Sequence, residues 1–280
     1  MRRHALLLAA VLLASIIAAW PAAAETPSAQ GDTDFAKVSR DWTASDYTVE
    51  KLTPFAEKGS VRAQTMLGYL YQRGTGVPAS PEQAARWFGR AAFANYHPAE
   101  YALARLYLTG FDGPKGHAQV LPLMRRAAEG GYPLAQVDLG LMYAEGKEAP
   151  RDPATAAEWF RKAAEQDFAS GEYALAVALI EGQGVKTNPE EGFRWALKAA
   201  EQDHGPAQYL AGVSLLKGIG TKPDPVAGRT WLILAAKNNA PGAGAALKAL
   251  DQKAPDDVRQ AAMDKASTFK PRQQQKPPAH

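Results

Sequence analysis

The chain repeats itself with a period of 36 residues, and this period limits its possible folds more than any other feature. A small residue opens each repeat and is position 0 of the unit. These residues are Ala63, Ala99, Ala135, Gly171, Ala207 and Ala243. Position 4 is leucine or alanine, position 5 is always small, and position 11 is glycine. Units of this size cannot bury their apolar surface alone, so the period predicts repeats that stack on their neighbours.

The conserved spacing within the unit predicts two helices joined by a turn. Positions 0, 4 and 8 form one apolar stripe on a first helix, and a small position 5 lets a second helix approach closely. Glycine at position 11 suits a left-handed C-terminal cap. Proline at position 18 suits the first turn of the second helix, where its missing N–H is no loss. Tryptophan at position 24 and alanine at position 28 lie one turn apart and are expected to face the first helix.

Residues that recur at these positions support this interpretation. The glycine column is Gly74, Gly110, Gly146, Gly182 and Gly218. The proline column is Pro81, Pro153, Pro189 and Pro225, and the tryptophan column is Trp87, Trp159, Trp195 and Trp231. The predicted fold class is therefore all-α, an α-solenoid of helix–turn–helix repeats with right-handed superhelical curvature.

The pattern A-x-x-x-L-G-x-x-Y-x-x-G-x-G-V, followed by P-x-x-A-x-x-W-x-x-K-A-A-E-x-G, resembles the Sel-one-like repeat (SLR), a relative of the tetratricopeptide repeat. Residues 135–170 match it best. The resemblance implies a non-enzymatic scaffold that assembles or regulates other proteins. It does not identify a partner or a pathway.

The same columns divide the chain into segments. Five full SLR units cover residues 63–242, and residues 42–62 form an N-terminal half-repeat because Phe55–Gly59 match the end of a unit. We expect residues 25–41 to be a linker and residues 243–269 to form C-terminal capping helices. The tail 270–280 contains three prolines and no apolar anchor, so we expect it to be disordered.

The N-terminal residues predict a secretory signal peptide over 1–24. Arg2 and Arg3 precede a stretch of 16 apolar or small residues, and Ala22–Ala24 supply a cleavage site before Glu25. The alternative is a retained membrane anchor, but the stretch is shorter than the roughly 20 residues that span a bilayer. We therefore expect a secreted protein, located in the periplasm, with no stable membrane insertion after cleavage.

Charge and cysteine content exclude several classes of function. The chain has no cysteine, so it contains no disulfide, zinc-thiolate site, iron–sulfur cluster or cysteine nucleophile, and no cysteine for lipid attachment. The net charge is +3. Arg2 and Arg3 would leave with the signal peptide, and the tail carries three more positive charges, so residues 25–269 carry about −2. The basic residues are interspersed with acids, which argues against a nucleic-acid partner.

Repeat two departs from the pattern. His117 replaces the proline, Leu123 replaces the tryptophan, and Pro122 falls inside the expected second helix. Because an interior proline costs about 3 kcal/mol, the helix is predicted to start late or to kink near Gln119–Leu121. We expect drift of a loop sequence rather than a functional hinge.

Three motifs that could carry chemistry are better explained by the repeat. Ser214 and Lys217 fit S-x-x-K, but no S-D-N or K-T-G follows, and both occupy ordinary first-helix positions. The G-x-G turns lack the rest of a phosphate loop. The histidines show no metal-ligand spacing. The sequence therefore predicts no catalytic, cofactor-binding or metal-binding residues.

The remaining candidate is the concave surface lined by the first helices, where positions 2 and 6 lie beside the core stripe. Aromatic and arginine side chains are common anchors of recognition surfaces. The predicted partner-binding residues are Thr65, Tyr69, Tyr101, Arg105, Tyr173 and Tyr209. The alternative is that these side chains pack between neighbouring first helices.

We expect a protein or peptide partner in this groove. A polysaccharide or peptidoglycan ligand is the second hypothesis, since the tyrosines would serve it as well. An enzyme of β-lactam or cell-wall chemistry is the third.

Overall fold

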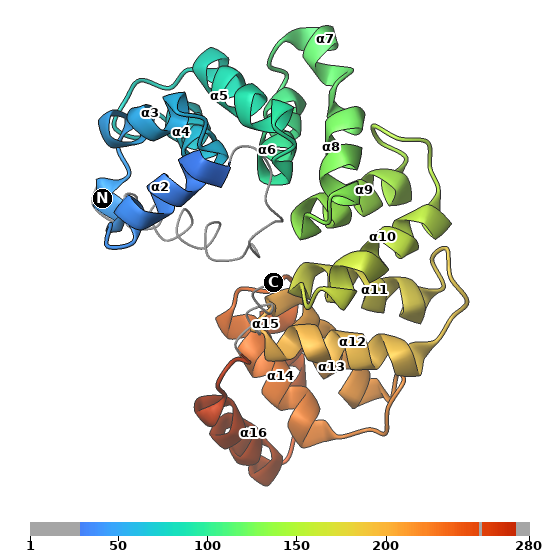
Figure 1. Cartoon of the computed structure of the whole chain (residues 1–280). Helices are drawn as coiled ribbons and strands as arrows, with labels where there is room; N and C mark the ends of the chain where they lie inside the picture. The colour runs from blue at the N-terminus through green and yellow to red at the C-terminus, as the bar shows by residue number, and fades with distance from the viewer. Residues whose placement is uncertain (1–28, 252–253, 273–280) are drawn as a thin grey trace. The chain divides into compact units, whose positions relative to one another are not determined.

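The computed structural model describes residues 29–251 and 254–272, and these residues form α-helices, one short 3-10 helix and no strand (Figure 1). They fall into two compact units, residues 29–132 and residues 133–272. Within each unit, consecutive helices pack as hairpins, and each hairpin packs on the next.

The helices of the first unit are α2 (Ala29–Ser39), η1 (Ala44–Asp46), α3 (Val49–Glu57), α4 (Val61–Arg73), α5 (Pro81–Phe93), α6 (His97–Leu108), α7 (Gly113–His117) and α8 (Val120–Glu129). The helices of the second unit are α9 (Pro133–Glu145), α10 (Pro153–Glu165), α11 (Ala169–Glu181), α12 (Pro189–Glu201), α13 (Gly205–Lys217), α14 (Pro225–Lys237), α15 (Ala243–Asp251) and α16 (Asp256–Thr268).

Both ends of the hairpin turn are set by local sequence. Gly74, Gly182 and Gly218 adopt the left-handed conformation at the C-caps of α4, α11 and α13, as predicted. The predicted prolines are the first residues of the second helices. Each is preceded by a capping side chain that accepts from the first-turn amides: Ser80, Asp152, Asn188 and Asp224.

The turn between repeats also has a left-handed residue, at position 32 of the unit. It is occupied by the residue types that adopt positive φ most easily, namely Asn95, Gly131, Asp167, Asp203 and Asn239. This turn ends one hairpin and starts the next.

Small residues at position 5 bring the two helices of a hairpin together. A Cβ on Gly68 would lie 2.4 Å from a ring carbon of Phe88, and one on Gly140 would lie 2.5 Å from Phe160. The residue after the tryptophan therefore supplies the deepest contact, and Phe88 is completely buried. The tryptophans lie nearer the edge of the second helix, and Trp159 and Trp195 are only half-buried.

Repeat two contains the predicted irregularity. The segment after Gly110 forms the short helix α7, and α8 begins at Val120. Pro122 consequently lies in the first turn of α8, where no intrahelical bond to its nitrogen is required. The prediction of a late start is confirmed.

Within the predicted linker, residues 29–39 form the helix α2. Phe35 on α2 is buried and packs edge-on against Trp42, with ring centroids 5.9 Å apart. Asp32 accepts hydrogen bonds from the hydroxyl and amide groups that begin α4, Ser60 Oγ at 2.7 Å and Arg62 N at 3.2 Å. One aromatic contact and one capping carboxylate thus hold α2, in a segment that was predicted to be a linker.

The second unit ends in α15 and α16, which cover the last repeat. Beyond α16, Phe269 packs against Trp231, and Arg272 forms ion pairs, although the sequence predicted disorder from residue 270. The predicted signal peptide and residues 273–280 lie outside the described residues. Over 29–251 and 254–272, no helix has the length and apolar character needed to cross a membrane.

Candidate functional site

In the first unit, Tyr69 lies at the centre of an aromatic and basic surface on α4 and α6. Its ring packs edge-on against Phe88, with centroids 5.0 Å apart, and the guanidinium of Arg73 lies 5.5 Å from the ring. Burial raises the pKa of the Tyr69 phenol, while the positive charges of Arg73 and Arg105 act against this shift. Arg105, on the neighbouring first helix, is exposed. The charge of Arg105, on the first helix of the next repeat, thus acts on the phenol of Tyr69.

Thr65 and Tyr101 are placed differently from Tyr69. Thr65 is buried, and its hydroxyl donates to the carbonyl of Val61 at 2.7 Å, so it presents no group to a partner in this conformation. This corrects its assignment to the groove. Tyr101 is half-buried and packs edge-on against Tyr132, with ring centroids 5.3 Å apart. Part of its ring is therefore used to join one repeat to the following turn.

In the second unit, Tyr173 and Tyr209 are also half-buried. Tyr173 lies 5.2 Å from the ring of His204, and Tyr209 packs against the alanines that precede and begin α15. Burial raises the pKa of the Tyr173 phenol. The three tyrosines at position 2 therefore pack against the residue at position 33, in the turn that follows their repeat.

A column of buried polar residues directly follows the small residue of each repeat, and none of them was among the predicted site residues. These residues are Gln64, Glu100, Gln136, Glu172 and Gln208, each 5% exposed or less. They lie on the first helix, and two of them bond to the second helix of the preceding repeat. Gln64 and Gln208 donate to carbonyls at the end of that helix, Ala56 at 2.8 Å and Ala200 at 3.3 Å.

Amide side chains near the end of the second helix bond to the same column. Gln166 donates to Gln136 at 2.7 Å, and Gln202 donates to Glu172 at 2.7 Å. Repeat two has Gly130 instead, because the ring of His97 fills the space that its Cβ would need. The sequence signal for this column was the recurrence of glutamine or glutamate at position 1, beside the core stripe.

Where the column carries glutamate, a cation from the second helix joins two repeats. Arg126 pairs with Glu100 and donates to Asn95 at 3.0 Å. Lys198 pairs with Glu172 at 2.8 Å and with Asp167 at 3.1 Å. The two triads occupy the same positions of the unit, two repeats apart. The cation is arginine in the first and lysine in the second, and the residue in the left-handed turn is neutral in the first and charged in the second.

In the second triad, burial and ion pairing shift the pKa values of the carboxyl groups in opposite directions. Burial raises the pKa of Glu172 despite the nearby ammonium group of Lys198. Burial also acts on Asp167, but hydrogen bonds from Arg272 and Lys198 hold its pKa below the ordinary value. Asp167 is therefore the carboxylate of this triad that stays ionised most readily.

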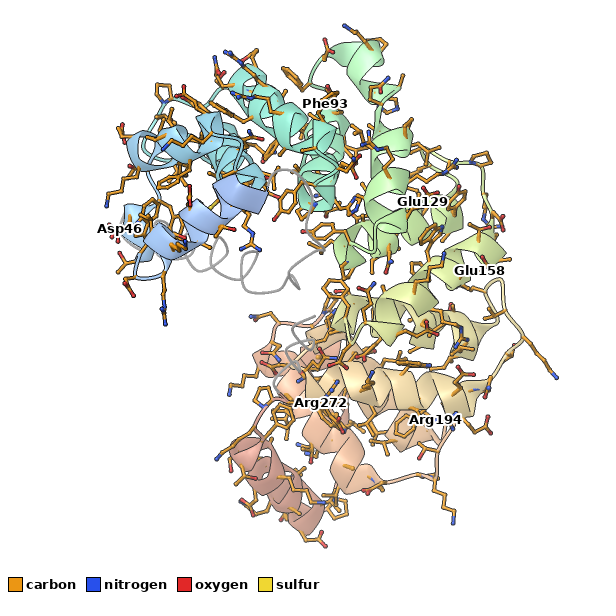
Figure 2. All side chains as sticks on the ribbon, in the orientation of Figure 1. Asp46, Phe93, Glu129, Glu158, Arg194 and Arg272 are labelled. Atoms are coloured by element: carbon orange, nitrogen blue, oxygen red, sulfur yellow. The ribbon has the colours of Figure 1, made fainter. Side chains whose placement is uncertain are left out.

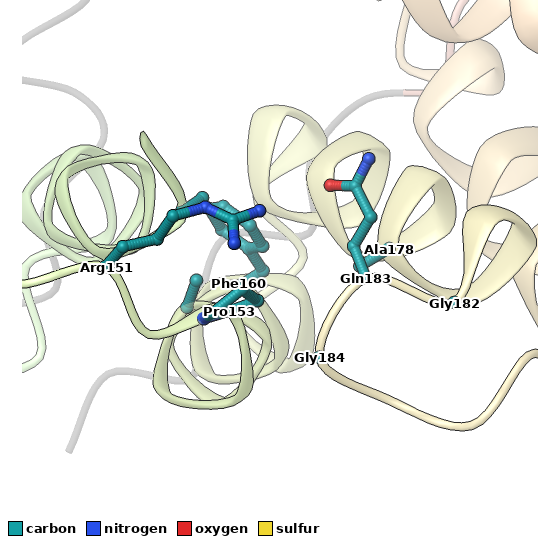
Figure 3. A pocket seen from close by; sticks show the side chains of 9 residues that line it. Arg151, Pro153, Phe160, Ala178, Gly182, Gln183 and Gly184 are labelled. Carbon is teal, nitrogen blue, oxygen red and sulfur yellow. The ribbon is translucent and has the colours of Figure 1, made fainter. Parts of the chain in front are cut away.

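A cavity of about 320 Å³ opens between the turns of repeats three and four in the second unit. Phe160, Ala156 and Ala178 line it with apolar surface, and Arg151 and Gln183 line it with polar side chains (Figure 3). Gly184 lies so close to α10 that a Cβ would fall 2.0 Å from the carbonyl oxygen of Pro153. The G-x-G turn thus serves packing between repeats.

The residues considered for catalysis or metal binding have structural surroundings. Ser214 is completely buried, whereas Lys217 is exposed, so the two do not form an accessible nucleophile and base. His204 accepts from the amide of Ala207 at the start of α13, and burial lowers its pKa. Among the described residues, no group of three or more acidic or histidine side chains could hold a metal ion.

Two solved structures are similar to this chain in their fold. A Sel1 repeat protein from Oxalobacter formigenes is similar in structure, with a TM-score of 0.66, 24% identity, and coverage of 89% of this chain and 100% of that one. A protective antigen present in uropathogenic Escherichia coli strains, which displays an SLR fold, matches with a TM-score of 0.55, 22% identity, and coverage of 86% of this chain and 60% of that one. Both likenesses concern the fold. The search of curated proteins gave no match.

The family comparison agrees with the hairpins in the structure. The model of the Sel1 repeat matches residues 61–95, 97–132, 133–168, 169–204 and 205–239. These are the five units predicted from the 36-residue period, shifted by two or three residues. Because the matched repeats cover more than half of the sequence, the chain belongs to the Sel1 repeat family.

Proposed function

We propose that this protein is a non-enzymatic scaffold of the bacterial envelope that binds a protein or peptide partner on the exposed side of its first helices. Sel1 repeats generally mediate protein–protein interaction. The observation that carries the proposal is the approach of Arg73 and Arg105 to Tyr69, because arginine and tyrosine supply much of the binding energy of interfaces. The periplasmic location rests on the signal-peptide pattern of residues 1–24.

The chemistry of this surface favours a partner with acidic or carbonyl-rich segments. Two guanidinium groups offer planar donors to carboxylates, and the phenol offers a further hydrogen bond. Tyr101 adds a half-exposed ring on the same first helix as Arg105. The residues to test are therefore Tyr69, Tyr101 and Arg105.

Photocrosslinking in intact cells tests the proposal. A photoreactive amino acid at Arg105 should capture a defined envelope protein, identified by mass spectrometry. Tyr69→Ala and Arg105→Ala should weaken the purified complex at least tenfold while the helical circular dichroism is kept. Arg86→Ala, on the exposed side of α5, is the control and should bind normally. Unchanged affinity in both test variants contradicts the proposal.

A glycan array separates the second hypothesis from the first. Binding to envelope polysaccharide that is lost in Tyr101→Ala, with no protein captured by crosslinking, would favour a polysaccharide-binding module.

A further inference from the structure

The segment that follows α16 lies across three repeats of the second unit, and its contacts are those of a bound peptide. Phe269 packs edge-on against Trp231 of α14, with ring centroids 5.4 Å apart. Arg272, labelled in Figure 2, follows three residues later. Its amide donates to the carbonyl of Glu201, the last residue of α12, at 2.7 Å. One aromatic contact and one main-chain bond thus fix the direction of the segment.

The side chain of Arg272 makes the remaining contacts between the segment and the repeats. Its guanidinium donates to both carboxylate oxygens of Asp167, at 2.9 and 3.1 Å. Its Nε lies 3.9 Å from the carboxylate of Glu201. A two-point contact between guanidinium and carboxylate is selective for arginine, because lysine cannot match its planar geometry.

Without Arg272, the side chains around this contact carry a net negative charge. Asp167, Glu172 and Glu201 contribute three negative charges, and Lys198 contributes one positive charge. Removal of the segment would leave an acidic surface beside an uncovered tryptophan. Such a surface attracts a basic, aromatic peptide.

The matching triad of the first unit shows that this site is not a general property of the repeat. There the left-handed turn residue is Asn95, which accepts from Arg126 and carries no charge. Asp167 has the same place in the unit and the same backbone conformation. Its extra charge is what the guanidinium of Arg272 binds.

We propose that Asp167, Glu201 and Trp231 form a binding site for an extended peptide with an aromatic residue and an arginine three positions later, and that Phe269–Arg272 occupy this site as an autoinhibitory segment. This rests on the proposed function, since it names the chemistry of one partner segment. A partner peptide binds when it displaces the resident segment, whose effective concentration is on the order of millimolar.

The test uses the full chain and a fluorescent, amidated peptide with the sequence of residues 266–272, ASTFKPR. Fluorescence anisotropy should detect binding to the Arg272→Ala chain, which cannot fill its own site. Binding to the wild-type chain should be at least tenfold weaker. Lys270→Ala, which alters an exposed residue of the same segment, is the control and should behave like the wild type.

Two further variants separate recognition from folding. The double variant Arg272→Ala/Asp167→Asn recreates the neutral residue of the first triad and should lose at least tenfold in affinity while its melting temperature shows a folded chain. A peptide with alanine in place of arginine should fail to bind Arg272→Ala. Equal binding to wild type and Arg272→Ala, or no binding to either at millimolar peptide, overturns the proposal. Neither outcome depends on the partner captured in cells, so the proposed function can fail or stand separately.

Discussion

The ammonium group of Lys198 lies 2.8 Å from the carboxylate of Glu172, whose side chain is completely buried. The lysine reaches this carboxylate from the surface, with its ammonium group 4.9 Å from the centre of the Trp195 ring. Lys198 also contacts Asp167, in the turn at the end of the preceding repeat. One side chain therefore compensates a buried charge and ties two repeats together.

Lys198→Ala should lower the stability of the chain by about 3 kcal/mol, because it leaves a buried carboxylate without its cation. Urea denaturation followed by circular dichroism measures this loss. Burial raises the pKa of Glu172 in the folded state, so the folded variant holds a proton that the unfolded chain releases at lower pH. The stability of the variant should therefore fall further as the pH rises from 5 to 8.

The double variant Lys198→Ala/Glu172→Gln is the matched control. Glutamine occupies the same position in repeats three and five, as Gln136 and Gln208, so the neutral side chain should restore most of the stability. Lys186→Ala, at an exposed lysine, should have no effect. If the double variant is as unstable as the single one, the loss does not come from the unpaired charge.

Two glycines of repeat one should respond in opposite ways to alanine. Gly68→Ala should cost about 1–3 kcal/mol, because the new Cβ would lie 2.4 Å from the buried ring of Phe88. Gly89→Ala, inside α5 with no atom within 4 Å of the new Cβ, should stabilise the chain by about 0.5–1 kcal/mol. Thermal denaturation compares the two variants. A loss of equal size in both would mean that helix contact is not what requires Gly68.

The contribution of Asp167 to the stability of the folded chain should disappear at low pH. Its pKa is held below the ordinary value of 3.8, so the ionised form is the one that folding favours. The stabilisation is present above that value and is lost as the pH falls below it. The melting temperature of the wild type should exceed that of Asp167→Asn at pH 6, and the difference should shrink as the pH is lowered towards 3. A constant difference across this range would contradict the ion pair with Arg272.

A double-mutant cycle on Tyr101 and Tyr132 should separate packing from recognition. An edge-on aromatic pair contributes about 0.5–1.5 kcal/mol beyond burial, so replacement of both tyrosines by leucine should cost less than the sum of the single changes. Partner binding measured on the same variants should depend on Tyr101 and not on Tyr132, which is buried. A coupling energy near zero would leave Tyr101 as a recognition residue alone.

The hairpins could be predicted from the sequence because their boundaries depend on local rules. Proline at the start of the second helix and glycine at the end of the first act on the backbone of their own turn, as Pro81 and Gly74 do. The late start of α8 followed from Pro122 for the same reason. The helix α2 could not be read in this way, because its stability depends on Phe35 reaching Trp42 and Phe55.

The candidate sites were less accessible to sequence reasoning because exposure depends on neighbouring repeats. Thr65 and Tyr69 lie one helical turn apart, yet Thr65 is buried and Tyr69 is partly exposed. The contact between Asp167 and Arg272 joins residues 105 positions apart and follows no period, so the repeat pattern gave no indication of it.

The pair of triads has a consequence for how such an array can diversify. Asparagine and aspartate differ by one group of nearly equal size, and both tolerate the left-handed turn at Asn95 and Asp167. A single substitution can therefore add or remove a negative charge at this turn while the backbone stays unchanged. The charge at each junction between repeats can thus vary independently of the fold, as it does between Asn95, Asp167 and Asp203.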